Sequence, residues 1–177
     1  MSKRSLLAKV GAPVAVLALF AGCSPSPATA IELDGVKVSE STIGDYAEGC
    51  RTIMRSADGT PSTEGDARRL TVSMVGNGMI ADKLVAQYGV AAPTSDQLAE
   101  AQARMTNLKP AFDQSSCNQA AQGAVKLMAL ALSQADRPVL RDAEAISPVV
   151  NPRYGTWNPE LLTVDGTGSL SELGLGA

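Results

Sequence analysis

The side chains with the most definite chemistry in this sequence are its three cysteines, because the chain contains no histidine. Without histidine there is no Ser-His or Cys-His pair for nucleophilic catalysis, and no histidine ligand for zinc. Cys50 and Cys117 lie too far apart in the chain to form a Cys-x-x-Cys redox pair. We therefore expect the cysteines to have roles outside thiol catalysis, and the surroundings of Cys23 define the first of them.

An export signal precedes Cys23. Lys3, Arg4 and Lys9 stand before a short apolar stretch that runs from Val10 and ends in small residues. A positively charged start followed by a short apolar run is typical of a secretory signal. This run is shorter than the roughly 20 residues that a transmembrane helix needs. We therefore expect export of the chain rather than a membrane span.

The end of the signal is more specific than an ordinary cleavage site. The tetrapeptide Phe-Ala-Gly-Cys that ends at Cys23 resembles the bacterial lipobox, although Phe20 stands where leucine is usual. The resemblance implies removal of a signal peptide over residues 1–22, lipid attachment to Cys23, and anchoring on the extracytoplasmic face of the cell membrane. An ordinary signal peptide with a chance cysteine is the alternative. Residues 23–30 are small, polar and proline-containing, which predicts a lipidated cysteine followed by a flexible tether.

The composition of the mature chain limits its fold and its partners. Removal of residues 1–22 from the 177-residue chain leaves 155 residues, 12 of the 15 basic residues and all 18 acidic ones, so the formal charge is −6. A nucleic-acid-binding protein normally carries a basic face, and no such cluster is present. Few aromatic residues are available, so Leu, Val, Ile, Met and Ala must build the core, which favours helices. A chain of this length suits one domain.

Cys50 and Cys117 form an even pair of thiols once Cys23 carries lipid. Outside the cytoplasm such a pair is most simply a disulfide, and two separate buried thiols are the alternative. Cys50 shares one face of the first predicted helix with Ile43 and Ala47, so it points inward. A bridge between the two cysteines would hold the first and fourth predicted helices together.

Apolar residues recur at helical spacing in four segments. They predict helices over about 43–55, 64–88 and 114–135, and one that runs from a Thr94–Gln97 capping box to about residue 108. After residue 135 either the chain breaks at 137–138 or a further short helix continues to 144. Gly76-Asn77-Gly78 falls inside the second of these helices. It lacks the preceding strand and the Lys-Ser/Thr of a phosphate loop, so we expect a kink or a close helix contact there.

Short strands are predicted at both ends of the domain. Asp34-Gly35 lies between alternating runs over 31–38, which indicates a hairpin or one bent strand. Val149-Val150 and the segment 154–157 are extended candidates for pairing with 31–38, so the two chain ends would meet in a small sheet. The domain is then expected over 31–164, with a flexible tail over 165–177.

The order of these elements resembles that of the N-terminal domain of SurA-type periplasmic chaperones. The resemblance rests on a strand and turn, a capped helix, and a long helix that ends in Leu84–Val90 and leads into Pro93–Leu98. The extended segment Val149–Asn158 is similar to the C-terminal segment of actinobacterial lipoproteins that carry such a domain. The resemblance implies a mainly α domain of four or five helices, with a two- or three-stranded sheet joining the N- and C-terminal ends.

The resemblance further implies a chaperone-like lipoprotein that binds unfolded or exported polypeptides. It does not imply isomerase activity, because the foldases of this family carry a separate parvulin domain and parvulins share histidines that this chain lacks. An envelope adaptor that binds one specific partner is the alternative. Flexible methionines adapt to varied sequences. The polypeptide-binding candidates are therefore four methionines, unless they simply fill the core: Met54, Met74, Met79 and Met105.

Catalysis is not expected from the remaining acidic residues. Asp45 with Glu48, and Asp142 with Glu144, are close in sequence, but solvated helix faces explain them better than paired acid and base groups. The Asp residues beside glycine indicate turns, and no EF-hand spacing surrounds them. We therefore expect no enzyme activity, no cofactor and no metal. The expected partners are the membrane, through Cys23, and polypeptides.

Overall fold

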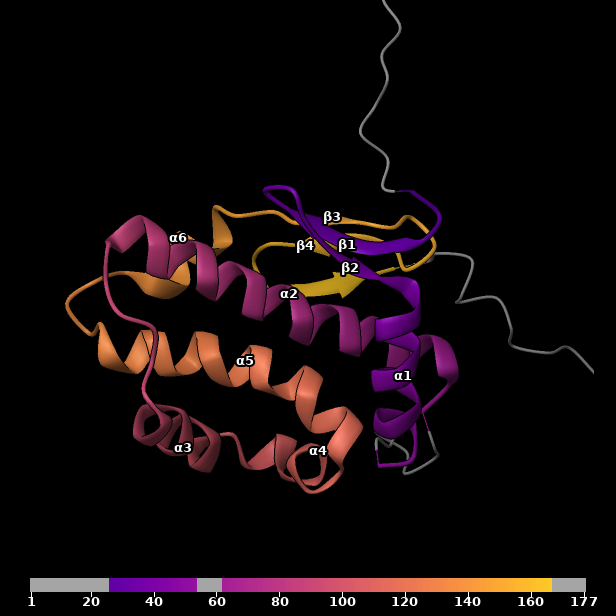
Figure 1. The fold of residues 1–177 in the computed structure, drawn as a ribbon, viewed down its shortest axis with the longest axis horizontal. Helices are drawn as coiled ribbons and strands as arrows, with labels where there is room; N and C mark the ends of the chain where they lie inside the picture. The colour runs from indigo at the N-terminus through magenta and orange to yellow at the C-terminus, as the bar shows by residue number, and fades with distance from the viewer. Residues whose placement is uncertain (1–25, 54–61, 167–177) are drawn as a thin grey trace, which may run out of the picture.

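The computed structural model describes residues 26–53 and 62–166. Within these residues the protein is mainly helical with a small antiparallel sheet, as predicted (Figure 1). The helices are α1 (Glu40–Arg51), α2 (Glu64–Tyr88), α3 (Ser95–Arg104), the 3₁₀ turn η1 (Thr106–Leu108), α4 (Lys109–Asp113), α5 (Ser115–Ser133) and α6 (Val139–Glu144). The strands are β1 (Thr29–Leu33), β2 (Val36–Ser39), β3 (Val149–Val150), β4 (Thr156–Asn158) and β5 (Thr163–Asp165).

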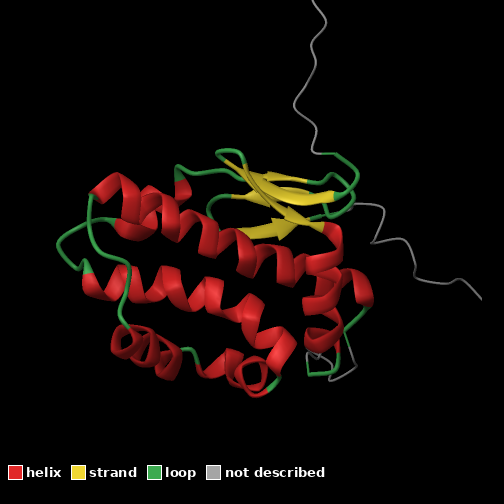
Figure 2. Ribbon diagram, viewed as in Figure 1, coloured by secondary structure: helices red, strands yellow, loops and turns green. Residues whose placement is uncertain are grey.

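The elements are stacked in layers. All strands gather on one side of the molecule, α2 and α5 cross the middle, and α3 and α4 lie on the opposite side (Figure 2). The long helix α2 contacts α1 and α5 as well as β1 and β5. It is therefore the element around which the other layers are assembled.

The β1–β2 hairpin forms at the predicted Asp-Gly turn. Asp34 and Gly35 have φ values of 50° and 83°, and a two-residue hairpin turn with both φ values positive is the type I′ turn that Asp-Gly favours. Leu33 pairs with Val36 directly beside the turn. The alternative of one bent strand is therefore wrong.

The two ends of the domain meet in one sheet, as predicted. The strand order is β2-β1-β3, and β3 pairs antiparallel with β1 by placing Ile31 opposite Val150. Asn151 strengthens this junction, because its side-chain Nδ2 donates to the carbonyl oxygen of Thr29 at 3.0 Å. β3, near the end of the domain, thus holds β1, the strand with which the domain begins.

The predicted pairing of residues 154–157 with β1 is wrong. β4 pairs instead with β5 in a second, two-stranded sheet, and Trp157 lies opposite Val164. After β3 the chain turns away from β1, and in this turn the Tyr154 amide donates to the Asn151 carbonyl. Gly155 then adopts a φ of 122°, where a Cβ atom would overlap the carbonyl oxygen of Asp165. This glycine redirects the chain and permits the close approach of β5.

Several predicted boundaries need correction. β1 begins at Thr29 and Ala30 is fully buried, so the fold starts before residue 31. At the other end, β5 reaches Asp165, which lies in the predicted tail. The first helix begins at Glu40 rather than about residue 43, because Ser39 is its N-cap and accepts from the Thr42 amide.

The third predicted helix is divided. It ends at Arg104 rather than about residue 108, and η1 and the unpredicted helix α4 follow it. Pro110 occupies the first turn of α4, where its missing N–H costs nothing, so it begins a helix instead of only interrupting one. The second helix has the predicted bounds, and the short α6 is the predicted further helix.

Glycines explain how closely α2 packs against its neighbours. A Cβ atom on Gly78 would lie 2.9 Å from the Cα atom of Gly123 in α5, and one on Gly123 would overlap the Met74 carbonyl oxygen. Gly76 meets the other layer, because its Cβ would lie 2.7 Å from Cζ3 of Trp157. The close helix contact predicted at Gly76-Asn77-Gly78 is therefore confirmed, and α2 is tightly packed on two sides.

A pair of glycine substitutions tests this packing. Gly123→Ala should lower the free energy of unfolding by about 1–3 kcal/mol, because the added methyl group has only helix backbone to displace. Gly44→Ala in α1 is the matched control, since its Cβ would lie 3.5 Å from the flexible Arg68 side chain. That change should stabilise by about 0.5–1 kcal/mol. Equal unfolding midpoints in urea for the two variants would contradict the account.

Candidate functional site

The two internal cysteines are joined, as predicted. Cys50 of α1 and Cys117 of α5 form a disulfide with a Cα–Cα distance of 4.7 Å, and both residues are fully buried. Met74 and Ala121 pack in the same apolar cluster. The bridge therefore fixes α1 against α5 in the interior and leaves no thiol there for chemistry.

The predicted methionine candidates do not form one groove. Met74 is 2% exposed and belongs to the core around the disulfide, as the core-filling alternative predicted. Met105 is half-buried beside the small cluster between α3 and α5. Met79, on α2, lines a surface pocket. Met54 and the lipidation candidate Cys23 lie outside the described residues.

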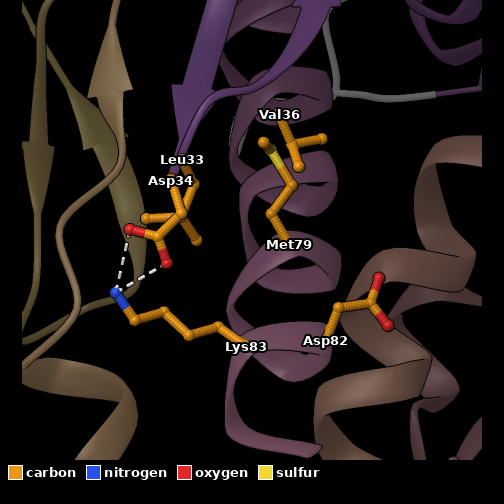
Figure 3. Close-up of a pocket in the computed structure, with 6 residues that line it drawn as sticks. All are labelled: Leu33, Asp34, Val36, Met79, Asp82 and Lys83. Carbon is orange, nitrogen blue, oxygen red and sulfur yellow. Dashed lines mark hydrogen bonds and ion pairs between the residues drawn. The ribbon is translucent and has the colours of Figure 1, made fainter. Parts of the chain in front are cut away.

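The pocket beside Met79 lies between the β1–β2 hairpin and α2, and we call it the hairpin pocket (Figure 3). Its volume is about 270 Å³, and its lining comprises Leu33, Asp34, Val36, Met79, Asp82 and Lys83. Val36 is 62% exposed, although it is a large apolar residue in a strand. Val36 of the hairpin and Met79 of α2 both line the pocket (Figure 3). The pocket thus presents apolar, adaptable surface to solvent.

The charged groups at the rim of the hairpin pocket are paired. Lys83 Nζ lies 2.9 Å from Oδ2 of Asp34 and 3.2 Å from its Oδ1, which holds the hairpin turn to α2. The Asp82 carboxylate pairs with Lys126 of α5. Because these charges have partners within the domain, Leu33, Val36 and Met79 remain as the groups for ligand contact. The arrangement suits an apolar side chain better than an ion.

A free strand edge lies next to this pocket. In the part of the chain that the structure describes, β2 pairs with β1 on one side and with no strand on the other. An edge strand presents unpaired N–H and C=O groups that an added strand can bond. The hairpin pocket and the β2 edge together offer an extended polypeptide both main-chain partners and a side-chain pocket.

A second hollow lies on the opposite side of the molecule, and we call it the α3–α4 hollow. Its volume is about 480 Å³, and its lining comprises Ala99, Gln102, Ala103, Thr106, Lys109, Phe112 and Asp113. It combines an aromatic ring with amide, hydroxyl and charged groups. Sequence reasoning missed this hollow because its wall includes η1 and α4, which were not predicted.

A hydrogen-bonded cluster near the start of α1 was also missed. The buried Tyr154 hydroxyl donates to Oε2 of Glu40, and Arg153 Nη1 lies 3.6 Å from the same carboxylate oxygen. Burial and the Glu40 carboxylate raise the pKa of the Tyr154 hydroxyl far above its ordinary value of 10. The cluster ties the segment after β3 to α1, so its chemistry serves the fold.

Tyr88 has a similar structural role at the other end of α2. Its hydroxyl donates to Oδ2 of Asp142 at 2.6 Å, while the Arg137 guanidinium lies 4.6 Å from the ring centre. Burial and the Asp142 carboxylate raise the pKa of Tyr88 to about 12. Asp142 thus holds α6 to α2, and it is not paired with Glu144 for acid–base chemistry. Asp45 and Glu48 are exposed, as predicted for a solvated helix face.

The described residues contain no cluster of three or more His, Cys, Asp or Glu side chains arranged for a metal ion. No helix within residues 26–53 and 62–166 has the length and apolar character needed to cross a bilayer. Searches against known protein families, curated proteins and solved structures give no match. The candidate site is therefore defined by geometry alone, namely the hairpin pocket with the β2 edge.

The disulfide should contribute strongly to stability. It closes a loop of 67 residues, which is worth about 4 kcal/mol if the bridge acts mainly by restricting the unfolded chain. The double variant Cys50→Ala/Cys117→Ala should lose about this amount in urea unfolding, and reduction of the wild-type protein should have a comparable effect. An unchanged midpoint under reducing conditions, with loss of the bridge verified by mass, would contradict this role.

The raised tyrosine pKa predicts a stability loss at alkaline pH. The unfolded chain releases the Tyr154 proton near pH 10, whereas the folded protein retains it to higher pH. The contribution of Tyr154 to the free energy of unfolding should therefore be constant below about pH 10 and fall as the pH rises above that value. Tyr154→Phe should make this fall shallower, because phenylalanine has no proton to lose. Identical alkaline slopes in urea titrations of the two proteins would refute the assignment.

Proposed function

We propose that this protein is a lipoprotein, anchored through Cys23 on the extracytoplasmic face of the cell membrane, with a SurA-like domain that binds unfolded or exported polypeptides. The signal and lipobox-like sequence before Cys23 support the anchor. The mainly helical fold with a sheet joining both chain ends is consistent with the family resemblance. We propose binding without isomerase or other enzyme activity, because the site offers apolar contacts and the chain lacks histidine.

The observation that carries this proposal is the apolar hairpin pocket beside the open β2 edge. An unfolded client has free main-chain groups, which can add to the edge as an extra strand regardless of sequence. One of its apolar side chains can then enter the pocket between Val36 and Met79. The unbranched Met79 side chain can adjust to side chains of different shape. Main-chain hydrogen bonding to the β2 edge and an adaptable pocket together support the binding of clients with different sequences.

The second candidate function is that of an envelope adaptor with one defined partner. The α3–α4 hollow favours it, because Gln102, Lys109 and Asp113 supply polar groups at fixed positions around Phe112. Placed polar groups select a particular surface, since an incorrect partner leaves them unpaired. Broad suppression of client aggregation supports the chaperone-like function, and its absence supports the adaptor.

Two valine substitutions test the site. The purified wild-type domain should reduce the aggregation of several unrelated unfolded clients, and Val36→Lys should remove most of that effect. Lysine places a charge at the apolar pocket and is a residue that blocks strand addition at sheet edges. Val149→Lys is the matched control, because Val149 is also an exposed valine in an edge strand, at 44% exposure against 62% for Val36.

The outcomes separate the two candidate functions. Loss of suppression in Val36→Lys alone supports the hairpin pocket as the client site. Equal suppression by both variants and the wild type excludes this pocket. No suppression by the wild-type protein with any client contradicts the chaperone-like function and favours the adaptor. Matching unfolding midpoints should first establish that both variants are folded.

A further inference from the structure

The folded domain begins very close to the proposed lipid anchor. The Thr29 amide donates to the Ser26 carbonyl at 2.8 Å, and the Glu40 amide at the start of α1 donates to the Ala28 carbonyl at 2.9 Å. The Ser26 and Thr29 hydroxyl oxygens also lie 3.0 Å apart. Residues from Ser26 onward are therefore bound into the domain, and the tether is shorter than the 23–30 that the sequence predicted.

The remaining tether sets a short maximum distance. Only Ser24 and Pro25 separate Cys23 from Ser26. Three residue steps of an extended chain span at most about 10–11 Å. The headgroup layer on one side of a bilayer is about 5–7 Å thick. A lipid attached to Cys23 would thus hold Ser26 at or just above the headgroups.

The surface around Ser26 can be identified, and we call it the tether corner. It consists of exposed residues that neighbour the start of β1: residues 26–28, Ser41, Pro152 and Arg153. Asn151 fixes the 152–153 turn there, through its bonds to Thr29 and to the Arg153 amide. The Arg153 side chain pairs with Glu40 at 3.6 Å but is still 44% exposed, so the side of the guanidinium that faces solvent can also contact lipid phosphate.

We infer that the tether corner lies against the lipid headgroups and that the α3–α4 hollow opens away from the membrane. This inference rests on the lipid anchor of the proposed function. In Figure 1 the described chain begins at the top beside the sheet, whereas α3 and α4 lie at the bottom. A domain of about 140 residues has a radius of gyration of about 14 Å, so these two sides differ clearly in their distance from the bilayer. The tether corner thus contacts the membrane surface, and the α3–α4 hollow faces away from the membrane, toward other components of the envelope.

Fluorophores on opposite sides of the lipidated full chain test this orientation. Ser41→Cys places a label at the tether corner, and Ala99→Cys places one at the α3–α4 hollow; both positions are exposed. Each protein is reconstituted in phosphatidylcholine–phosphatidylglycerol vesicles that contain a headgroup-nitroxide lipid. The label at residue 41 should be quenched several-fold more than the label at residue 99. An insertion of about 20 Gly/Ser residues before Ser26, with a mean span of about 25 Å, should remove most of this difference.

Charge variants test the contribution of Arg153. Arg153→Glu should reduce quenching at residue 41, because the tether corner then repels anionic headgroups. Arg104→Glu is the matched control in α3, where the Arg104 side chain is 59% exposed and paired with Glu100. It should leave the quenching at residue 41 unchanged. A reduction of equal size in both variants would overturn the contact of Arg153 with the membrane surface.

The outcomes distinguish the inference from the proposed function. Vesicle flotation of the wild-type chain but not of Cys23→Ser supports the anchor. Flotation with equal quenching at residues 41 and 99 overturns the inferred orientation and leaves the anchor intact. Failure of the wild-type chain to float overturns both the anchor and the inferred orientation. Client binding is measured separately and does not depend on this result.

Discussion

The structure depends on how closely α2 can approach elements on two of its sides at once. Gly78 of α2 meets Gly123 of α5 backbone to backbone, and Gly76 receives the Trp157 ring from the strand layer. A larger residue at any of these glycines would separate a layer from the helix. Because α2 spans the domain, this constraint places the sheet and α5 in fixed relation. α3 and α4 pack on α5, whereas α1 and α6 contact both α2 and α5.

The chain ends are fastened around this central packing. β3 holds β1, Tyr154 bonds to Glu40, and the disulfide joins α1 to α5. The first two of these links stabilise the sheet side, so the β1–β2 hairpin can extend over α2 with Val36 in solvent. The hairpin pocket arises from that overhang, and the Asp34–Lys83 ion pair holds it to the helix. The tightly packed α2 thus supports the hairpin that extends over it, and the hairpin pocket stays open between the two.

Local signals in the sequence account for much of this fold. Helical periodicity, the Asp34-Gly35 turn and the pair Cys50 and Cys117 predicted the long helices, the hairpin and the disulfide. Features that depend on distant residues were not predictable. Tyr154 and Glu40 are 114 residues apart, and a three-residue strand such as β5 is too short to show a period. The hairpin pocket was only partly foreseen, because methionine type suggested Met79 but also Met74, which is buried.

The central claim is that an unfolded polypeptide binds between the hairpin and α2. Methyl NMR of the protein labelled with ¹³C at its methionine methyl groups tests it most directly, since Met79 lines the pocket and Met74 lies in the core. Addition of a permanently unfolded client should shift or broaden the Met79 methyl resonance and leave the Met74 resonance unchanged. An unchanged Met79 resonance at client concentrations where aggregation is suppressed would contradict the account.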